Sequence, residues 1–314
     1  MTDDATDPDD TETESSTAPD ANADTGSIGG TGIATVDGCR IAYRRAGTDG
    51  PAVVLLHGGG IDDSALSWRH TIDRLGDEYQ VYAPDWPGYG NSEPDGEHTI
   101  ERYAELLAGF LDAVGLDSAT LVGLSMGGGA ALTVALDRPA RVDRLVLVNS
   151  YGLGERLPVG SLWKAAANIP GSNAMGWAAM GLSAELARIG LTPLVSSGAS
   201  LDSEFVSEFR DRAGAPGAGT AFEAFQRNEI TPRGRARTDY SDRLPMLSVP
   251  TLLVHGTDDP IVPEEWSVDA AASIPGAEVA IIDNCGHWTP RERPDRFGEL
   301  LTEFLAGGEP TGGE

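Results

Sequence analysis

The chain contains the stretch Leu-Val-Gly-Leu-Ser-Met-Gly-Gly at residues 121–128, in which Ser125 stands between two glycines. An apolar run that favours a strand precedes the serine, and a run that favours a helix follows it. Because the backbone must reverse from strand to helix within a few residues, small neighbours leave room for a strained turn that projects the hydroxyl outward. The pattern is typical of a nucleophile elbow and makes Ser125 the predicted nucleophile.

A second apolar run covers residues 53–56 and is followed by His57 and by three consecutive glycines at 58–60. At the C-terminal edge of a parallel sheet, such a glycine run exposes backbone N–H groups that can bind a developing oxyanion. This segment therefore predicts an oxyanion-binding loop near the serine.

Two later strand-like runs supply an acid and a base. One leads into a turn that contains Asp258 and Asp259, and the other leads to His287, which follows a glycine. A serine hydroxyl is a poor nucleophile at neutral pH, so Ser125 needs a base, and His287 is the candidate. The chain order Ser, Asp, His differs from the two common orders in serine proteases.

Strand-like and helix-like runs alternate along most of the chain. We expect strands near residues 33–43, 52–56, 80–83, 119–124, 144–148, 251–255 and 278–282. We expect helices near residues 65–75, 99–114, 126–137, 264–272 and 292–305. This alternation predicts an α/β fold with a mostly parallel, doubly wound sheet and helices on both faces.

The alternation stops at residues 151–244, which are rich in Ala and Gly, helical in period and without a convincing strand. We predict an inserted helical cap there, between core segments 31–150 and 245–314. Residues 1–30 are predicted to be an acidic, disordered tail. The first 26 of them hold nine Asp or Glu and almost no large apolar side chain, so they cannot offset the entropy of ordering.

These motifs resemble those of the α/β-hydrolase superfamily, and the resemblance covers residues 33–306. The segments 57–60, 125–128 and 285–288 look most like the hydrolases of meta-cleavage products, which split a carbon–carbon bond in vinylogous 1,5-diketones. The serine segment also resembles the cofactor-free haloperoxidase and esterase branch. The resemblance implies the α/β-hydrolase fold and a Ser-His-Asp hydrolase.

Two positions depart from the meta-cleavage pattern. Ile61-Asp62 stand where those enzymes usually have Pro-Gly, and Leu124 precedes the nucleophile where they often carry Asn. Both an ester and a diketone therefore remain candidate substrates.

Aligning the superfamily's turn Gly-x-x-Asp-x-x-Val-Pro on residues 256–263 selects Asp259, rather than Asp258, as the acid that orients the imidazole. Among the other histidines, His255 is the main rival to His287 because it lies beside Asp259 in the sequence. His57 is expected to be structural, and the remaining two, His70 and His98, are expected to be solvated.

The backbone N–H groups of Met126 and Gly59 are the expected oxyanion hole, with Gly60 as the alternative to Gly59. No metal or organic cofactor is required by this chemistry. Seven large apolar residues are candidates to line the substrate pocket, although such residues more often belong to the core: Trp163, Met175, Trp177, Met180, Phe222, Phe225 and Trp288.

The chain is strongly acidic, with 49 Asp and Glu against 22 Lys and Arg and a formal charge of −27. Lys164 is its single lysine. Such a surface repels nucleic acid and anionic membranes, so a small-molecule substrate is the expected partner. We interpret the acidity as adaptation to high salt, where screening removes much of the self-repulsion; an ordinary acidic protein is the alternative.

The sequence favours a cytoplasmic protein. Cys39 and Cys285 are too few for a disulfide framework and lack metal-ligand spacing, and no signal peptide is apparent. The uncharged runs 118–136 and 165–184 are explained by the elbow helix and by helix-breaking residues, so a membrane span is not expected.

The motifs together predict a serine hydrolase of a small or medium apolar carboxylic ester. Two alternatives remain: a carbon–carbon bond hydrolase, and a ligand-binding relative with little turnover. The sequence does not determine the oligomeric state.

Overall fold

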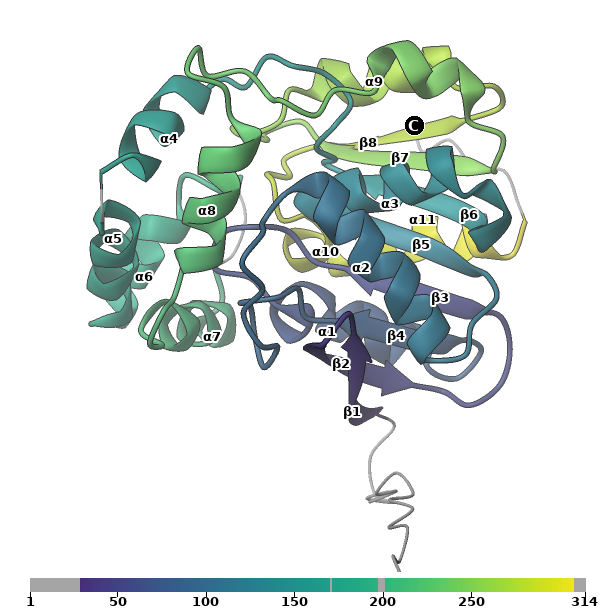
Figure 1. The fold of residues 1–314 in the computed structure, drawn as a ribbon, viewed down its shortest axis with the longest axis horizontal. Coiled ribbons are helices and arrows are strands. Elements are labelled where there is room, and N and C mark those ends of the chain that lie inside the picture. The colour runs from purple at the N-terminus through teal and green to yellow at the C-terminus, as the bar shows by residue number, and fades with distance from the viewer. Residues whose placement is uncertain (1–28, 170, 197–200, 308–314) are drawn as a thin grey trace, which may run out of the picture.

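The computed structural model describes residues 29–169, 171–196 and 201–307, and these residues form one eight-stranded sheet (Figure 1). The spatial order is β1-β2-β4-β3-β5-β6-β7-β8. The strands are β1 (Gly29–Val36), β2 (Cys39–Ala46), β3 (Ala52–Leu56), β4 (Gln80–Pro84), β5 (Ala119–Leu124), β6 (Val142–Val148), β7 (Thr251–Gly256) and β8 (Glu278–Ile282). Strand β2 is antiparallel to β1 and β4, and all other neighbours are parallel. The predicted fold class is confirmed.

The single strand predicted near residues 33–43 was wrong, because the structure has two strands there. The chain turns at Asp37 and Gly38, whose φ angles are 49° and 81°, and β2 returns along β1. A two-residue turn with positive φ at both positions matches hairpin twist and favours Asp-Gly. Strand β1 begins at Gly29, so the last two residues of the predicted tail belong to the sheet. The rest of that tail, residues 1–28, lies outside the described residues.

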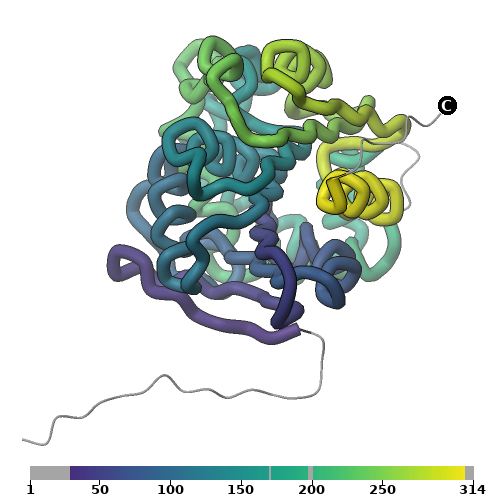
Figure 2. Tube along the Cα trace, turned by 90° about the vertical axis from the view of Figure 1, so that its right-hand side faces the viewer, coloured from purple at the N-terminus to yellow at the C-terminus, as the bar shows by residue number. Residues whose placement is uncertain are grey.

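Helices cover both faces of the sheet, as Figures 1 and 2 show. One face carries α2 (Ile100–Ala113), α3 (Met126–Asp137) and α9 (Glu264–Ser273). The other carries α1 (Ser64–Leu75), α10 (Thr289–Glu292) and α11 (Pro294–Leu305). Leu121 of β5 packs into the first of these hydrophobic layers, and Val122 and Leu124 pack into the second. A central parallel strand buried on both faces reads as a continuous apolar run, which is the signal that predicted β5.

Between β6 and β7 the described residues form a helical insertion (Figure 1). Its helices are α4 (Gly160–Ala167), α5 (Ser172–Gly181), α6 (Ala184–Leu191), α7 (Ser203–Ala213) and α8 (Thr220–Glu229). They lie together at one side of the sheet. The described residues also form two 3-10 helices, η1 (Pro139–Arg141) and η2 (Ser241–Met246). The predicted end of the cap at residue 244 falls inside η2. Across the described stretches, every helix is too short or too polar to cross a bilayer.

Candidate active site

Ser125 lies between the end of β5 and the start of α3. Its φ of 52° and ψ of −116° form a conformation that residues with a side chain rarely adopt. The surrounding backbone holds this turn in place: the N–H of Ser125 donates to the carbonyl of Val148 at 2.9 Å, and its carbonyl accepts the N–H of Tyr151 at 3.0 Å. The elbow predicted from the sequence is therefore present as a strained, hydrogen-bonded turn.

The glycines around Ser125 permit close approach of three backbone segments. A Cβ atom on Gly123 would lie 2.5 Å from the backbone of Gly127 and Gly128, and one on Gly127 would lie 2.4 Å from the carbonyl oxygen of Leu56. Real Cβ atoms do not come so close to other atoms. The glycine spacing is thus required by the packing of β3, β5 and α3.

Asp259 and His287 form a buried pair, with 2.7 Å between Asp259 Oδ2 and His287 Nδ1. The side chain of Asp259 is 1% exposed and that of His287 is 12% exposed. Oδ1 of Asp259 accepts the N–H groups of Ile261 and Val262 at 2.8 and 3.1 Å. Oδ2 also accepts the side-chain amide of Asn149 at 2.8 Å. An ionised Asp259 assigns the proton of the neutral imidazole to Nδ1, which leaves Nε2 as the basic nitrogen.

Asp259 and His287 also shift each other's pKa values. Burial favours a raised pKa for Asp259, but the charges and hydrogen bonds of His287 and His255 outweigh burial and hold this pKa well below its usual range. Burial opposes the charged form of His287, whereas the charge and hydrogen bond of Asp259 raise the pKa of the imidazole above its ordinary value. The site therefore combines an acid of lowered pKa, Asp259, with an imidazole of raised pKa, His287.

The rival acid, Asp258, and the rival base, His255, lie close to Asp259 but do not line the cavity described below. Asp258 is exposed. His255 is fully buried; its Nδ1 lies 2.7 Å from Ser267 Oγ, and its Nε2 lies 3.0 Å from the carbonyl of Val262 and 3.5 Å from Asp259 Oδ2. Both ring nitrogens of His255 thus lie close to protein groups, whereas His287 faces the cavity described below.

The other histidines have structural surroundings or face solvent. His57 is buried, and its Nε2 accepts the backbone N–H of Trp86 at 2.9 Å. The expectation that His98 is solvated was wrong: it is buried, with 2.9 Å between its Nδ1 and the hydroxyl of Tyr103. The segment before α2 packs there against the helical insertion, which sequence position alone does not reveal. His70 is exposed.

Met126 and Gly59 lie beside Ser125 at the cavity. Met126 is the first residue of α3, so its N–H has no acceptor within the helix. The N–H of the neighbouring Gly58 donates to Asp62 Oδ2 at 2.8 Å. A Cβ on Gly59 would lie 2.7 Å from the ring of Phe222, so a glycine is needed for α8 to pack on this loop. The oxyanion-hole assignment to Met126 and Gly59 stays a prediction.

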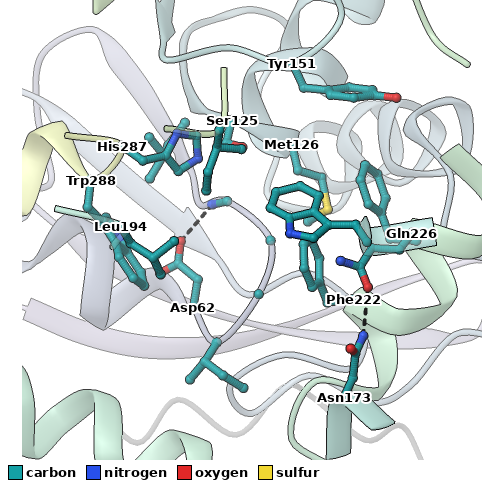
Figure 3. A pocket seen from close by; sticks show the side chains of 18 of the residues that line it. Asp62, Ser125, Met126, Tyr151, Asn173, Leu194, Phe222, Gln226, His287 and Trp288 are labelled. Carbon is teal, nitrogen blue, oxygen red and sulfur yellow. Dashed lines mark hydrogen bonds between the residues drawn. The ribbon is translucent and has the colours of Figure 1, made fainter. Parts of the chain in front are cut away.

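Ser125 and His287 face a cavity of about 240 Å³ at the boundary between the sheet and the helical insertion (Figure 3). Six of the seven predicted pocket residues line it: Trp163, Trp177, Met180, Phe222, Phe225 and Trp288. The prediction for the seventh, Met175, was wrong, because this residue is 75% exposed. Helix α5 turns positions 173, 177 and 180 toward the cavity, and a helical period of 3.6 residues points Met175 away from them.

Three polar lining residues were missed from the sequence: Asp62, Asn173 and Gln226. The side chain of Asp62 is 1% exposed, and Ser67 Oγ lies 2.8 Å from both its oxygens. Burial raises the pKa of Asp62 to about 6, against the opposing charge of His57 and the hydrogen bond from Ser67. Its only sequence signal was the departure from Pro-Gly at residues 61–62.

The cavity lining contains no Lys or Arg among the described residues. Within the same described ranges, no three His, Cys, Asp or Glu side chains are grouped so that they could hold a metal ion.

Comparisons with known proteins agree with this architecture. The family model for the alpha/beta hydrolase fold matches residues 51–294. The chain is 32% identical over 272 residues to a 2-hydroxymuconate semialdehyde hydrolase of Pseudomonas putida, covering 82% of this chain and 88% of the relative. It is also 32% identical to a 2-hydroxy-6-oxo-2,4-heptadienoate hydrolase of Pseudomonas putida, covering 82% and 90%.

Solved structures lead to the same family. A meta-cleavage product hydrolase of Pseudomonas fluorescens superposes with a TM-score of 0.74 at 27% identity, covering 88% of this chain and 97% of the other. A thermophilic esterase of Thermogutta terrifontis superposes with a TM-score of 0.71 at 27% identity, covering 88% and 98%. Relatives of this chain thus include meta-cleavage product hydrolases and esterases. The chain belongs to the α/β-hydrolase fold family and is a hydrolase.

Proposed function

We propose that this hydrolase cleaves uncharged carboxylic esters of small or medium size through Ser125, His287 and Asp259. Ser125 Oγ attacks the ester carbonyl while His287 Nε2 takes its proton, and Asp259 orients the imidazole and stabilises its charged form. The N–H groups of Met126 and Gly59 bind the oxyanion. His287 then protonates the leaving alcohol and activates the water that releases the acid. The observation that carries this proposal is that the strained Ser125 turn and the His287–Asp259 pair face one cavity.

The cavity lining supports an uncharged substrate. Its volume of about 240 Å³ lies slightly below the range of drug-sized ligand pockets, which suits a small or medium molecule. Most of its surface is aromatic or aliphatic, and it holds the carboxylate of Asp62 without a Lys or Arg among the described lining residues. A second carboxylate brought by a substrate would be desolvated here without a cationic partner, which is costly.

Carbon–carbon bond hydrolysis is the second candidate, and the relatives named above favour it. One of them acts, by its name, on 2-hydroxy-6-oxo-2,4-heptadienoate. That compound carries a carboxylate, for which the described lining residues offer no cationic side chain. The charge of the described lining residues therefore supports the ester as the first candidate.

A substrate panel distinguishes these functions. Purified protein is given p-nitrophenyl esters of graded chain length and, separately, 2-hydroxy-6-oxo-2,4-heptadienoate, at low and at molar KCl. We expect the highest kcat/KM for an ester. A higher kcat/KM for the dienoate would establish carbon–carbon bond hydrolysis instead, and no turnover of either class would favour the ligand-binding alternative.

We expect kcat/KM for the best ester to decrease as the pH is lowered. The midpoint of this acidic limb of the pH–rate profile should lie above the ordinary histidine pKa of about 6.5. The reason is that His287 must be unprotonated to act as a base, and Asp259 raises its pKa. In Asp259→Asn the largest charge that raises the pKa of His287 is gone while burial remains, so the limb should move to lower pH. A pH–rate profile of both proteins measures the shift, and a limb that stays in place would show that another group titrates.

We also propose adaptation to high salt, because residues outside the first 26 still carry a formal charge of −18. Full-length protein and a variant lacking residues 1–26 should both melt at higher temperature as KCl rises from about 0.1 to 3 M, since the Debye length falls from about 10 Å to below about 3 Å. Thermal unfolding measures this. Melting temperatures independent of salt in both proteins would contradict the proposal, and a dependence lost on deletion would assign it to the deleted residues.

A further inference from the structure

Two helices of the insertion each present a row of side chains to the cavity, and each row contains one carboxamide. On α5 the row is Asn173, Trp177 and Met180, at intervals of four and three residues. On α8 it includes Phe222, Phe225 and Gln226. Gln226 is buried and Asn173 is partly exposed. An apolar side chain would bury more favourably at position 226, because a buried amide without a partner is destabilising. The two polar exceptions therefore need an explanation.

The two carboxamides meet. Asn173 Nδ2 donates to Gln226 Oε1 at 2.7 Å, and Gln226 is only 4% exposed (Figure 3). This bond uses one hydrogen and one oxygen of the pair. It leaves a carbonyl oxygen on one amide and an NH2 group on the other, and exchanging the oxygen and nitrogen of both amides leaves the same two groups. Within the described residues, neither remaining group has a further hydrogen bond.

The remaining groups define the chemistry of a ligand. An NH2 donor beside a carbonyl acceptor matches a hydroxyl, which accepts from the first and donates to the second. A charged group fits poorly, because no Lys or Arg of the described residues lines the cavity and Asp62 contributes negative charge. Figure 3 shows Asn173 and Gln226 on the side of the cavity away from Ser125 and His287. The matching hydroxyl therefore lies at the end of the substrate remote from the reacting carbonyl.

We propose that Asn173 and Gln226 form a specificity subsite for a terminal hydroxyl, so that the enzyme prefers hydroxyl-terminated esters to alkyl esters of equal length. This inference rests on the proposed esterase function and names its substrate class more closely. A purely structural link between α5 and α8 is the competing explanation, and it makes no distinction between the two kinds of ester.

The test compares matched esters that differ only in a terminal hydroxyl or methyl group. One series carries that group on the acyl chain and a second carries it on the alkoxy chain, because either half of the ester can face the insertion. The readout is the ratio of kcat/KM for the hydroxyl-terminated ester to that for its methyl-terminated partner. In the unmodified enzyme we expect this ratio to reach about tenfold or more in one series.

Gln226→Met and Asn173→Leu keep side-chain size and remove the polar groups. Each should bring the ratio close to one or below while the methyl-terminated ester is still hydrolysed. Met175→Leu, an apolar exchange at an exposed position of α5, should leave the ratio unchanged. Asn173→Leu decides the question on its own if Gln226→Met does not fold.

The outcomes separate the two proposals. Hydrolysis of both kinds of ester with the same ratio in unmodified and variant enzymes would overturn the subsite and leave the esterase function intact. Equal losses on both esters in the variants would assign the pair a structural role and also overturn it. Absence of ester turnover in the unmodified enzyme would overturn the esterase function and the subsite with it.

Discussion

Ser125→Ala is expected to lower ester turnover by at least about ten-thousandfold while leaving the fold intact. Alanine lacks only the hydroxyl oxygen and fits the same turn, whose glycine neighbours and backbone hydrogen bonds do not involve that oxygen. Without the hydroxyl no acyl-enzyme forms, and only binding and the oxyanion-hole groups remain.

The measurement is kcat/KM on the best ester, together with a thermal melt. Ser118→Ala is a matched control, since Ser118 immediately precedes β5, the strand that leads to Ser125, and hydrogen-bonds Asp143 at the surface. The control should retain full turnover. A Ser125→Ala protein that melts normally and keeps more than a few per cent of turnover would show that another group is the nucleophile.

Asp259→Asn should reduce kcat by about ten-thousandfold, whereas Asp258→Asn should leave it near that of the unmodified enzyme. Asp259 Oδ2 accepts from His287 Nδ1, and an amide at this position can donate to Nδ1 and stabilise the wrong tautomer. Asp258 is exposed, and its carboxylate accepts a hydrogen bond from the hydroxyl of the neighbouring Thr257. The two changes are chemically identical and adjacent, so each is the control for the other.

Steady-state kinetics on the best ester give the ranking. Thermal unfolding checks that Asp259→Asn still folds, because the carboxylate also accepts the N–H groups of Ile261 and Val262. If Asp258→Asn proves the more damaging change, the acid has been assigned one residue too late in this turn.

Local sequence was sufficient for much of the fold. Strands β3, β5 and β7 are buried on both faces, so their apolar runs are continuous and easily recognised. The elbow was also predictable, because Gly123 and Gly127 are demanded by contacts within a few residues of Ser125 and with the adjacent β3. The hairpin of β1 and β2 carried a local signal too, the Asp-Gly turn at 37–38.

The choice between Asp258 and Asp259 came from resemblance to a family, since both residues are acidic and adjacent. The tertiary structure distinguishes them physically: Asp259 is buried against His287, and Asn149 at the end of β6 donates to the same oxygen. Asn149 was not predicted, because it is 110 residues away in the sequence and its neighbours give no sign of that contact.

The sequence by itself determined the α/β alternation, the elbow and the strand-end positions of an acid and a base, because each depends on residues that are close in the chain. Only the tertiary structure decided what surrounds them. Asp62 is buried at the cavity, and Asn173 meets Gln226 across 53 residues. Such contacts between the helical insertion and the core follow from how whole helices pack, and helical periodicity specifies which residues share a face but not which other helix that face meets.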